Sequence, residues 1–245
     1  MPITLDVLDG IAEVVIDIPP VNALGVDDWF ELADVLDGIA EDVRVAIVRA
    51  EGRGFCAGVD IKELQADPQA IVDVNRACAA AFAAVYECDV PVIAAVHGFC
   101  LGGGIGIAGS ADIVIASNDA TFGLPEVDRG ALGAATHLAR LVPEKRARAM
   151  LYTAETATAE ELYAYGSVLQ VVDREELEAA ARKTAEAIAA KHPTIIRRAK
   201  ESLNGIDPVD PRPRYRFEQG FTLELHARGI ASEVRDTFGD DEPGA

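Results

Sequence analysis

The sequence predicts an α/β layered fold, and three patterns along the chain support this prediction. Two alternating apolar runs, at 3–8 and 11–18, flank Asp9-Gly10, a dipeptide typical of a hairpin between antiparallel strands. Apolar segments at 43–50 and 91–97 are each followed by a glycine-rich turn and a helix, and this alternation of strand and helix characterises α/β proteins. Helical patterns fill most of the second half of the chain.

Helical spacing and turn residues predict the other elements of the core. A helix is expected after Asp27-Asp28, because apolar residues then recur every three or four positions and the two carboxylates suit a helix N-terminus. A strand at 113–116 precedes a turn at Pro125-Glu126, which leads into a helix. Further helices are expected at 145–152, 159–165, 175–190 and 193–203.

The end of the chain is expected to form a helical region apart from the strand-containing core. The three prolines within 206–213 predict an extended linker, because a residue that precedes proline is disfavoured in a helix. Residues 215–238 have the mixed charge of one last helix. We place the boundary near Lys191, so that 1–190 form the core and 191–245 form a C-terminal helical region.

Composition and charge narrow the functional classes. The 245 residues include 22 Lys and Arg against 41 Asp and Glu, a formal charge of −19 that repels nucleic acid and anionic lipid. The first residues lack the basic start and apolar core of a signal peptide, and the weakly charged stretch at 90–117 is too rich in glycine to favour a membrane span. The spacing of the four cysteines matches no zinc or redox motif, so we expect buried thiols. The sequence thus predicts a cytoplasmic protein with no nucleic-acid partner, membrane partner or metal site.

Two glycine-rich turns, at 52–62 and 101–106, each run from a strand into a helix. Small residues there let main-chain N–H groups face a ligand, and a helix start adds partial positive charge. Neither turn matches a Walker A sequence, and no dinucleotide-binding glycine pattern is placed after a strand. Two N–H sources that face one point indicate an oxyanion hole, which stabilises charge on a carbonyl oxygen. The alternative is that each turn only needs positive φ angles.

Four segments together resemble one family: 55–63, 91–98, 101–104 and 122–126 are similar to the corresponding motifs of the crotonases, also called enoyl-CoA hydratases/isomerases. The resemblance covers nearly the whole chain, in order. It implies the crotonase (ClpP-like) fold, a spiral of ββα units followed by C-terminal helices that build trimers, usually paired into hexamers. It also implies an acyl-CoA thioester substrate, so that coenzyme A is part of the substrate and no separate cofactor is expected.

The resemblance also implies positions for the substrate. The family holds the thioester oxygen with two main-chain N–H groups, which correspond to Val59 and Gly103. The residues implied to line the coenzyme A channel are Val21, Ala23, Ala57, Val59, Asp60, Ile61, Lys62 and Gly103. Lys62 and Arg53 are the cations nearest this region in sequence, and either could meet the phosphates or be solvated surface charge.

The acid–base groups depart from the usual family pattern. Family hydratases use two glutamates; the second corresponds to Glu126, while the first position holds Gly106. Since glycine cannot transfer a proton, we expect a one-carboxylate mechanism in which Glu126 acts, although a glutamate after proline also suits a helix start. Asp60 is expected to cap a helix rather than to react. His137 is either a second proton-handling group or a buried structural imidazole.

A narrower resemblance points to one reaction. The segments 51–55, 85–88, 122–138 and 216–225 are similar to those of the actinobacterial crotonases of cholesterol degradation. Those enzymes open a ring of a bicyclic methyl-dioxo-hexahydroindene carboxyl-CoA by adding water and breaking a C–C bond beside a ketone. Hydrolytic ring opening is therefore the leading expectation. The alternatives are hydration or isomerisation of an enoyl-CoA in fatty-acid β-oxidation, and acyl-CoA binding without catalysis.

Overall fold

The predicted hairpin begins the main sheet of the computed structural model, which describes residues 2–238. Strand β1 (Ile3–Leu8) pairs antiparallel with β2 (Ile11–Ile16), so that Leu8 lies opposite Ile11. Asp9 and Gly10 both have positive φ angles, 54° and 75°, as a tight two-residue hairpin turn requires. The hairpin prediction is confirmed, with the second strand ending two residues earlier than expected.

The main sheet of the described residues has six strands in the order β1-β2-β4-β6-β8-β11. Strands β4 (Val45–Ala50), β6 (Val92–Val96), β8 (Ile113–Ser117) and β11 (Gln170–Val172) extend it in parallel from β2. The central strands are buried on both faces and therefore read as continuous apolar runs rather than as alternating ones. The predictions at 43–50, 91–97 and 113–116 are confirmed.

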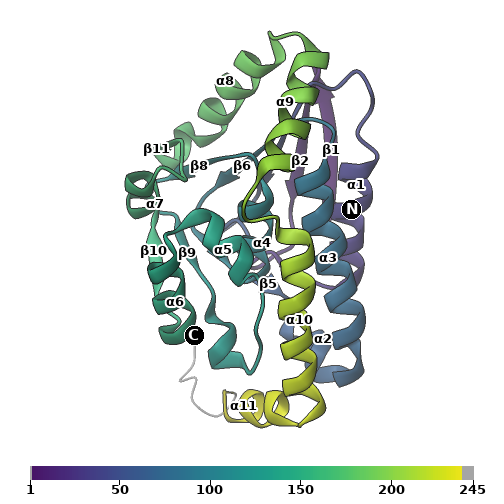
Figure 1. Ribbon diagram of the computed structural model, residues 1–245, viewed down its shortest axis with the longest axis vertical. Helices are drawn as coiled ribbons and strands as arrows, with labels where there is room; N and C mark the ends of the chain where they lie inside the picture. The colour runs from purple at the N-terminus through teal and green to yellow at the C-terminus, as the bar shows by residue number, and fades with distance from the viewer. Residues whose placement is uncertain (1, 239–245) are drawn as a thin grey trace.

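Shorter strands form a second layer. Strand β3 (Ala23–Leu24) pairs with β5 (Gly58–Val59), while β7 (Phe99–Leu101), β9 (Thr121–Gly123) and β10 (Thr156–Thr158) form a sheet in the order β10-β9-β7. After β2, β4, β6 and β8 the chain enters this layer and then continues into a helix. Each such passage is one ββα unit, so the implied α/β spiral is confirmed (Figure 1).

Helices connect the layers and cover them. The helices before the last region are α1 (Val26–Asp37), α2 (Ile61–Ala66), α3 (Ile71–Glu87), α4 (Gly103–Ser110), α5 (Ala135–Leu141), α6 (Glu144–Thr153), α7 (Ala159–Tyr165) and α8 (Leu177–Ala189), with short 3-10 turns η1 (Pro68–Ala70), η2 (Pro125–Arg129) and η3 (Arg174–Glu176). The predicted helices at 145–152, 159–165 and 175–190 correspond to α6, α7 and α8.

The two faces of the main sheet are covered differently. Helix α8 lies on one face, where its small residues Ala181 and Ala185 pack against Ile47 and Ile93. The other face supports a larger core that contains Trp29, Phe82 and Phe122, together with helices α1, α3 and α4. Burying each of these large side chains stabilises the fold by about 1.5–3 kcal/mol relative to exposure. A pocket partly lined by Phe82 lies on this second side.

The structure corrects two predictions about the end of the chain. The linker expected at 206–213 is shorter, because α9 (Pro193–Ile206) is followed by α10 (Pro211–Ala227), whose first turn contains Pro211 and Pro213. Proline suits this position, since the first N–H groups of a helix have no acceptor within it, and the Asp210 side chain accepts a hydrogen bond from the Arg212 N–H at 3.0 Å. Two of the three prolines therefore belong to the start of a helix rather than to a linker.

The single helix expected over 215–238 is also wrong. The chain breaks after α10 at Gly229, which has a φ of +77°, and continues as α11 (Ile230–Phe238). Figure 1 shows α10 running alongside α3, with α11 turned across its end. Among residues 2–238, no helix has both the length and the apolar composition that crossing a membrane requires.

Candidate active site

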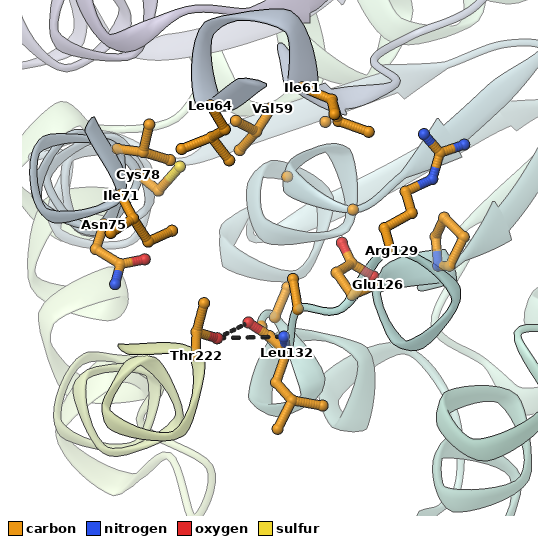
Figure 2. Close-up of a pocket in the computed structure, with 18 of the residues that line it drawn as sticks. Val59, Ile61, Leu64, Ile71, Asn75, Cys78, Glu126, Arg129, Leu132 and Thr222 are labelled. Carbon is orange, nitrogen blue, oxygen red and sulfur yellow. Dashed lines mark hydrogen bonds between the residues drawn. The ribbon is translucent and has the colours of Figure 1, made fainter. Parts of the chain in front are cut away.

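A pocket with a volume of about 110 Å³ lies where the second layer meets the helices. Its walls come from β5, α2, α3, the start of α4, the segment that follows β9, and α10 (Figure 2). Most of the lining side chains are apolar. The polar ones include Glu126 and Arg129 on one side and Asn75 on the other, with Thr222 from α10.

Glycines let the two predicted turns touch. A Cβ on Gly58, which has a φ of +96°, would lie 3.1 Å from the main-chain nitrogen of Gly103. Gly102, with a φ of 55°, immediately precedes α4 as its N-cap, and a Cβ built there would lie 3.5 Å from the Cα of Gly58. A side chain at residue 58 would press on the start of α4, so Gly58 lets β5 and the start of α4 come into direct contact.

The two residues expected to supply main-chain donors, Val59 and Gly103, lie beside this contact. The Asp60 N–H donates to the Leu24 oxygen at 2.9 Å, and because successive N–H groups of a strand alternate in direction, the N–H of Val59 points away from β3. Gly103 is in the first turn of α4, where N–H groups have no acceptor within the helix and the helix dipole is positive. Both residues line the pocket, so the two donors predicted from the sequence lie together.

Glu126 extends from η2 to the same place. A Cβ on Gly102 would lie 2.6 Å from Glu126 Oε1, and Oε2 is buried without a hydrogen-bond partner among the described residues. Burial raises the pKa of the Glu126 carboxyl to about 8, against the opposing attraction of the Arg129 guanidinium. The carboxyl therefore binds a proton through most of the neutral range and releases it just above.

The position of the first family glutamate, which is Gly106 in this chain, is physically closed. A Cβ on Gly106 would lie 2.1 Å from the ring of Phe82, so the aromatic side chain occupies the space that a larger residue would need. Phe82 itself is held by edge-on contacts with Trp29 and His137. Among the described residues that line the pocket, Glu126 is the one carboxylate.

The two secondary candidates lie outside the pocket lining. Asp60 Oδ1 accepts a hydrogen bond from the Lys62 N–H at 3.0 Å at the start of α2, which confirms the capping interpretation. His137 is fully buried and packs against the rings of Phe82 and Tyr215, with centroid distances of 4.9 and 5.1 Å. Burial lowers the pKa of His137 to about 3, so the imidazole is neutral and packs as part of the core.

The residues implied for coenzyme A are only partly gathered. Ala23 pairs with Gly58 in the β3–β5 sheet, and the Ala57 N–H donates to the Val21 oxygen at 3.2 Å, so these segments adjoin the pocket. Ala57 and Ile61 line it directly. Lys62 and Arg53 are exposed on the surface. The four cysteines are free and buried, as expected, and burial raises the pKa of Cys56 to about 12.

Helices α3 and α10 provide a wall of the pocket whose individual residues were not predicted, although the helix at 71–85 was expected to help set acyl specificity. Ile71, Val74, Asn75 and Cys78 line the pocket from one face of α3, at the spacing of neighbouring helical turns. That spacing was a usable signal for Asn75, a polar residue in an apolar helical row. No comparable signal marked Tyr215 and Thr222 of α10, because their role depends on how α10 docks.

Helix α10 also holds the segment that follows Glu126. The Glu218 carboxylate accepts hydrogen bonds from the N–H groups of Ala135 and Thr136, both at 2.8 Å, and so caps α5 from another helix. The Leu132 N–H donates to the Thr222 hydroxyl at 3.2 Å. The loop between Glu126 and α5 is thus fixed to the C-terminal region.

Comparisons with known proteins agree with this geometry. The sequence profile of the enoyl-CoA hydratase/isomerase family matches residues 6–218. The chain is 61% identical to the (7aS)-7a-methyl-1,5-dioxo-2,3,5,6,7,7a-hexahydro-1H-indene-carboxyl-CoA hydrolase of Rhodococcus jostii, over 94% of this chain and 91% of that protein. It is 56% identical to the hydrolase of the same name from Mycobacterium tuberculosis, over 97% and 98% of the two chains. The crystal structure of an enoyl-CoA hydratase/isomerase from Xanthobacter autotrophicus matches with a TM-score of 0.86 at 25% identity, covering 100% of this chain and 99% of that one.

Proposed function

Because the chain belongs to the enoyl-CoA hydratase/isomerase (crotonase) family and is an enzyme, we propose that it opens a ring of a bicyclic keto acyl-CoA thioester by hydrolysis in steroid catabolism. The observation that carries this proposal is the identity of 61% and 56% to two hydrolases of the indene-carboxyl-CoA, over nearly the full length of the chains. The single carboxylate of the pocket supports it, because ordinary hydration in this family uses two glutamates.

In the proposed complex, the thioester oxygen accepts hydrogen bonds from the Val59 and Gly103 N–H groups. This oxyanion hole draws electrons away from the acyl chain and stabilises an enolate next to the thioester carbonyl. The contact of the two glycine-rich turns supports this role, because it brings the donors together without any side chain between them.

Glu126 acts on water in the proposed reaction. The ionised carboxylate takes a proton from a water molecule while the oxygen of that water adds to a ring ketone. The tetrahedral adduct then collapses to a carboxylic acid, and the C–C bond beside the former ketone breaks. The electron pair of that bond passes through the conjugated system to the thioester oxygen, and protonated Glu126 returns its proton to the carbon chain. One water is consumed and the substrate undergoes no net oxidation or reduction, so the step needs no redox cofactor.

The coenzyme A part of the substrate is proposed to leave the pocket past β3 and β5. Val21, Ala23, Ala57 and Ile61 would line its path. The exposed Lys62 and Arg53 lie beyond this region and supply positive charge for the phosphates, which an acidic protein must otherwise repel.

Assembly and compartment belong to the same proposal. Large apolar side chains are exposed on α9 and α10, namely Ile195, Leu203, Ile206, Phe217 and Phe221, which supports association of the C-terminal regions into a trimer or hexamer. The four free thiols support a reducing, cytoplasmic location. Light scattering of the purified protein measures the number of subunits.

The reaction is tested with the bicyclic diketo CoA ester and with crotonyl-CoA. Mass spectrometry is expected to detect a ring-opened product that has gained one water from the first ester. Rapid loss of the conjugated absorbance of crotonyl-CoA, without ring opening of the bicyclic ester, would overturn the hydrolase proposal in favour of hydration. A shifted double bond in a 3-enoyl-CoA would identify an isomerase instead.

A further inference from the structure

Asn75 is an anomaly in the wall of the pocket. It is 8% exposed and lies on α3 between apolar residues that line the same cavity, Val74 and Cys78. Its side-chain nitrogen is buried and has no hydrogen-bond partner among residues 2–238. An unpaired buried amide costs about 1–3 kcal/mol, so a nonpolar residue of similar size would make the resting protein more stable.

The surroundings hold Asn75 in place without satisfying its side chain. Its main-chain oxygen accepts a hydrogen bond from Gln219 Nε2 of α10 at 2.6 Å, which ties this turn of α3 to the C-terminal region. The side-chain amide keeps one free torsion, and a half-turn about the Cβ–Cγ bond exchanges its oxygen and nitrogen. The group can therefore present an N–H donor to a ligand in the pocket.

The location selects the part of the substrate that this donor would meet. Figure 2 shows Asn75 on the opposite side of the cavity from Glu126. The thioester is proposed to bind at Val59 and Gly103, beside Glu126, so the α3 wall faces the acyl group away from the sulfur. The ring system named in the two relatives bears two keto oxygens, which accept hydrogen bonds and donate none.

We propose that Asn75 is a specificity-determining residue, whose side-chain N–H donates a hydrogen bond to a ring ketone of the acyl group. This inference rests on the proposed function for its substrate class. A plain enoyl chain offers no acceptor at this place and leaves the amide unpaired, so Asn75 favours keto-acyl substrates over ordinary fatty acyl ones. A site built to pair a polar group discriminates strongly against ligands that lack it.

The test compares three proteins, namely Glu126→Gln and two variants made from it, with three ligands. Asn75→Leu removes the donor and keeps the same branched arrangement of side-chain heavy atoms, and Ile71→Leu is the matched control on the same wall. Both are made in the Glu126→Gln background, with mass spectrometry verifying that the esters persist. The ligands are the diketo CoA ester and two analogues, each lacking one of the ring oxygens.

Asn75→Leu is expected to weaken binding of the diketo ester about 10- to 100-fold and to leave binding of one analogue unchanged, which identifies the ketone that is bound. Ile71→Leu is expected to affect all three ligands by similar small factors. Equal weakening of all three ligands by Asn75→Leu, or no weakening of any, would overturn the inference. If the parent enzyme fails to hydrolyse the diketo ester although the comparison shows this selectivity, the proposed function fails and the recognition by Asn75 stands.

Discussion

Replacing Glu126 with glutamine is expected to stabilise the fold at neutral pH while it removes turnover. Burial raises the pKa of this carboxyl from an ordinary 4.5 to about 8, so folding at pH 7 requires uptake of a proton. One pH unit corresponds to about 1.4 kcal/mol, and the interval from 4.5 to 7 amounts to about 3 kcal/mol, an upper value because the pocket admits solvent to Glu126. Glutamine has no such requirement, and loss of the acid–base group lowers the rate by about 10²–10⁴-fold.

The pH dependence gives this prediction its sign. Below pH 4.5 the carboxyl is protonated in both the folded and the unfolded chain, so the parent protein and Glu126→Gln should be equally stable. Between 4.5 and about 8 only the unfolded chain releases the proton, and the stability of the parent falls relative to the variant by about 1.4 kcal/mol for each pH unit. Above about 8 the difference is constant.

Urea unfolding at pH 5.5 and 7.5, at one protein concentration, measures the difference in the free energy of unfolding. Glu175→Gln, which removes an exposed carboxylate outside the pocket lining, is the control and should show no such dependence. A stability difference between the parent and Glu126→Gln that is the same at both pH values would refute the reasoning, as would full activity of the variant.

Three further predictions test the surroundings of the site. Gly106→Ala should destabilise the fold by about 1–3 kcal/mol, because the new methyl group overlaps the Phe82 ring. Gly220→Ala, which has open space around it on α10, is the control and should stabilise the fold by up to about 1 kcal/mol. Thermal unfolding compares the two variants, and equal effects on stability would contradict the overlap assigned to Gly106. Glu218→Gln should move the pH dependence of kcat/KM to lower pH, since the charge of Glu218 helps to raise the pKa of Glu126. An unchanged pH profile would show that Glu218 acts only as a helix cap. Trp29 is the one tryptophan of the chain, and its ring touches Gly103. Its fluorescence should therefore change when the protein is titrated with a CoA ester. If calorimetry detects binding while the emission stays constant, the thioester binds elsewhere.

Local signals predicted most of the fold because they reflect short-range physics. The Asp9-Gly10 turn requires two positive φ angles, and this requirement specified the first hairpin without any tertiary information. The prolines at 208–213 gave an ambiguous signal, because proline restricts only its immediate neighbours in the chain. Pro211 and Pro213 disfavour the residues before them in a helix, but they also suit a first helical turn, and only the docking of α10 decides between these outcomes.

The parts of the site that belong to short sequence motifs were predictable, whereas the parts that depend on how helices pack were not. Each glycine-rich turn is a short continuous motif, as is the segment that contains Glu126, and the structure brings these three motifs together. The sequence shows glycine rather than glutamate at position 106. It does not show that the Phe82 ring, which comes from α3, fills the space that a glutamate would need. The helical spacing of α3 offered a signal for Asn75, whereas Thr222 faces the pocket through the docking of α10, which no short pattern encodes.

The cap that α10 provides for α5 ties distant parts of the chain into one cooperative unit. Ala134, the N-cap residue that precedes α5, offers no capping side chain, and the acceptor is instead Glu218, 83 residues beyond Ala135. Detaching α10 therefore leaves the first amides of α5 without partners and frees the loop behind the pocket in the same event. Hydrogen exchange at Ala135 and Thr136 should consequently rise and fall with that of α10, so that opening of the pocket wall and fraying of α5 become a single event.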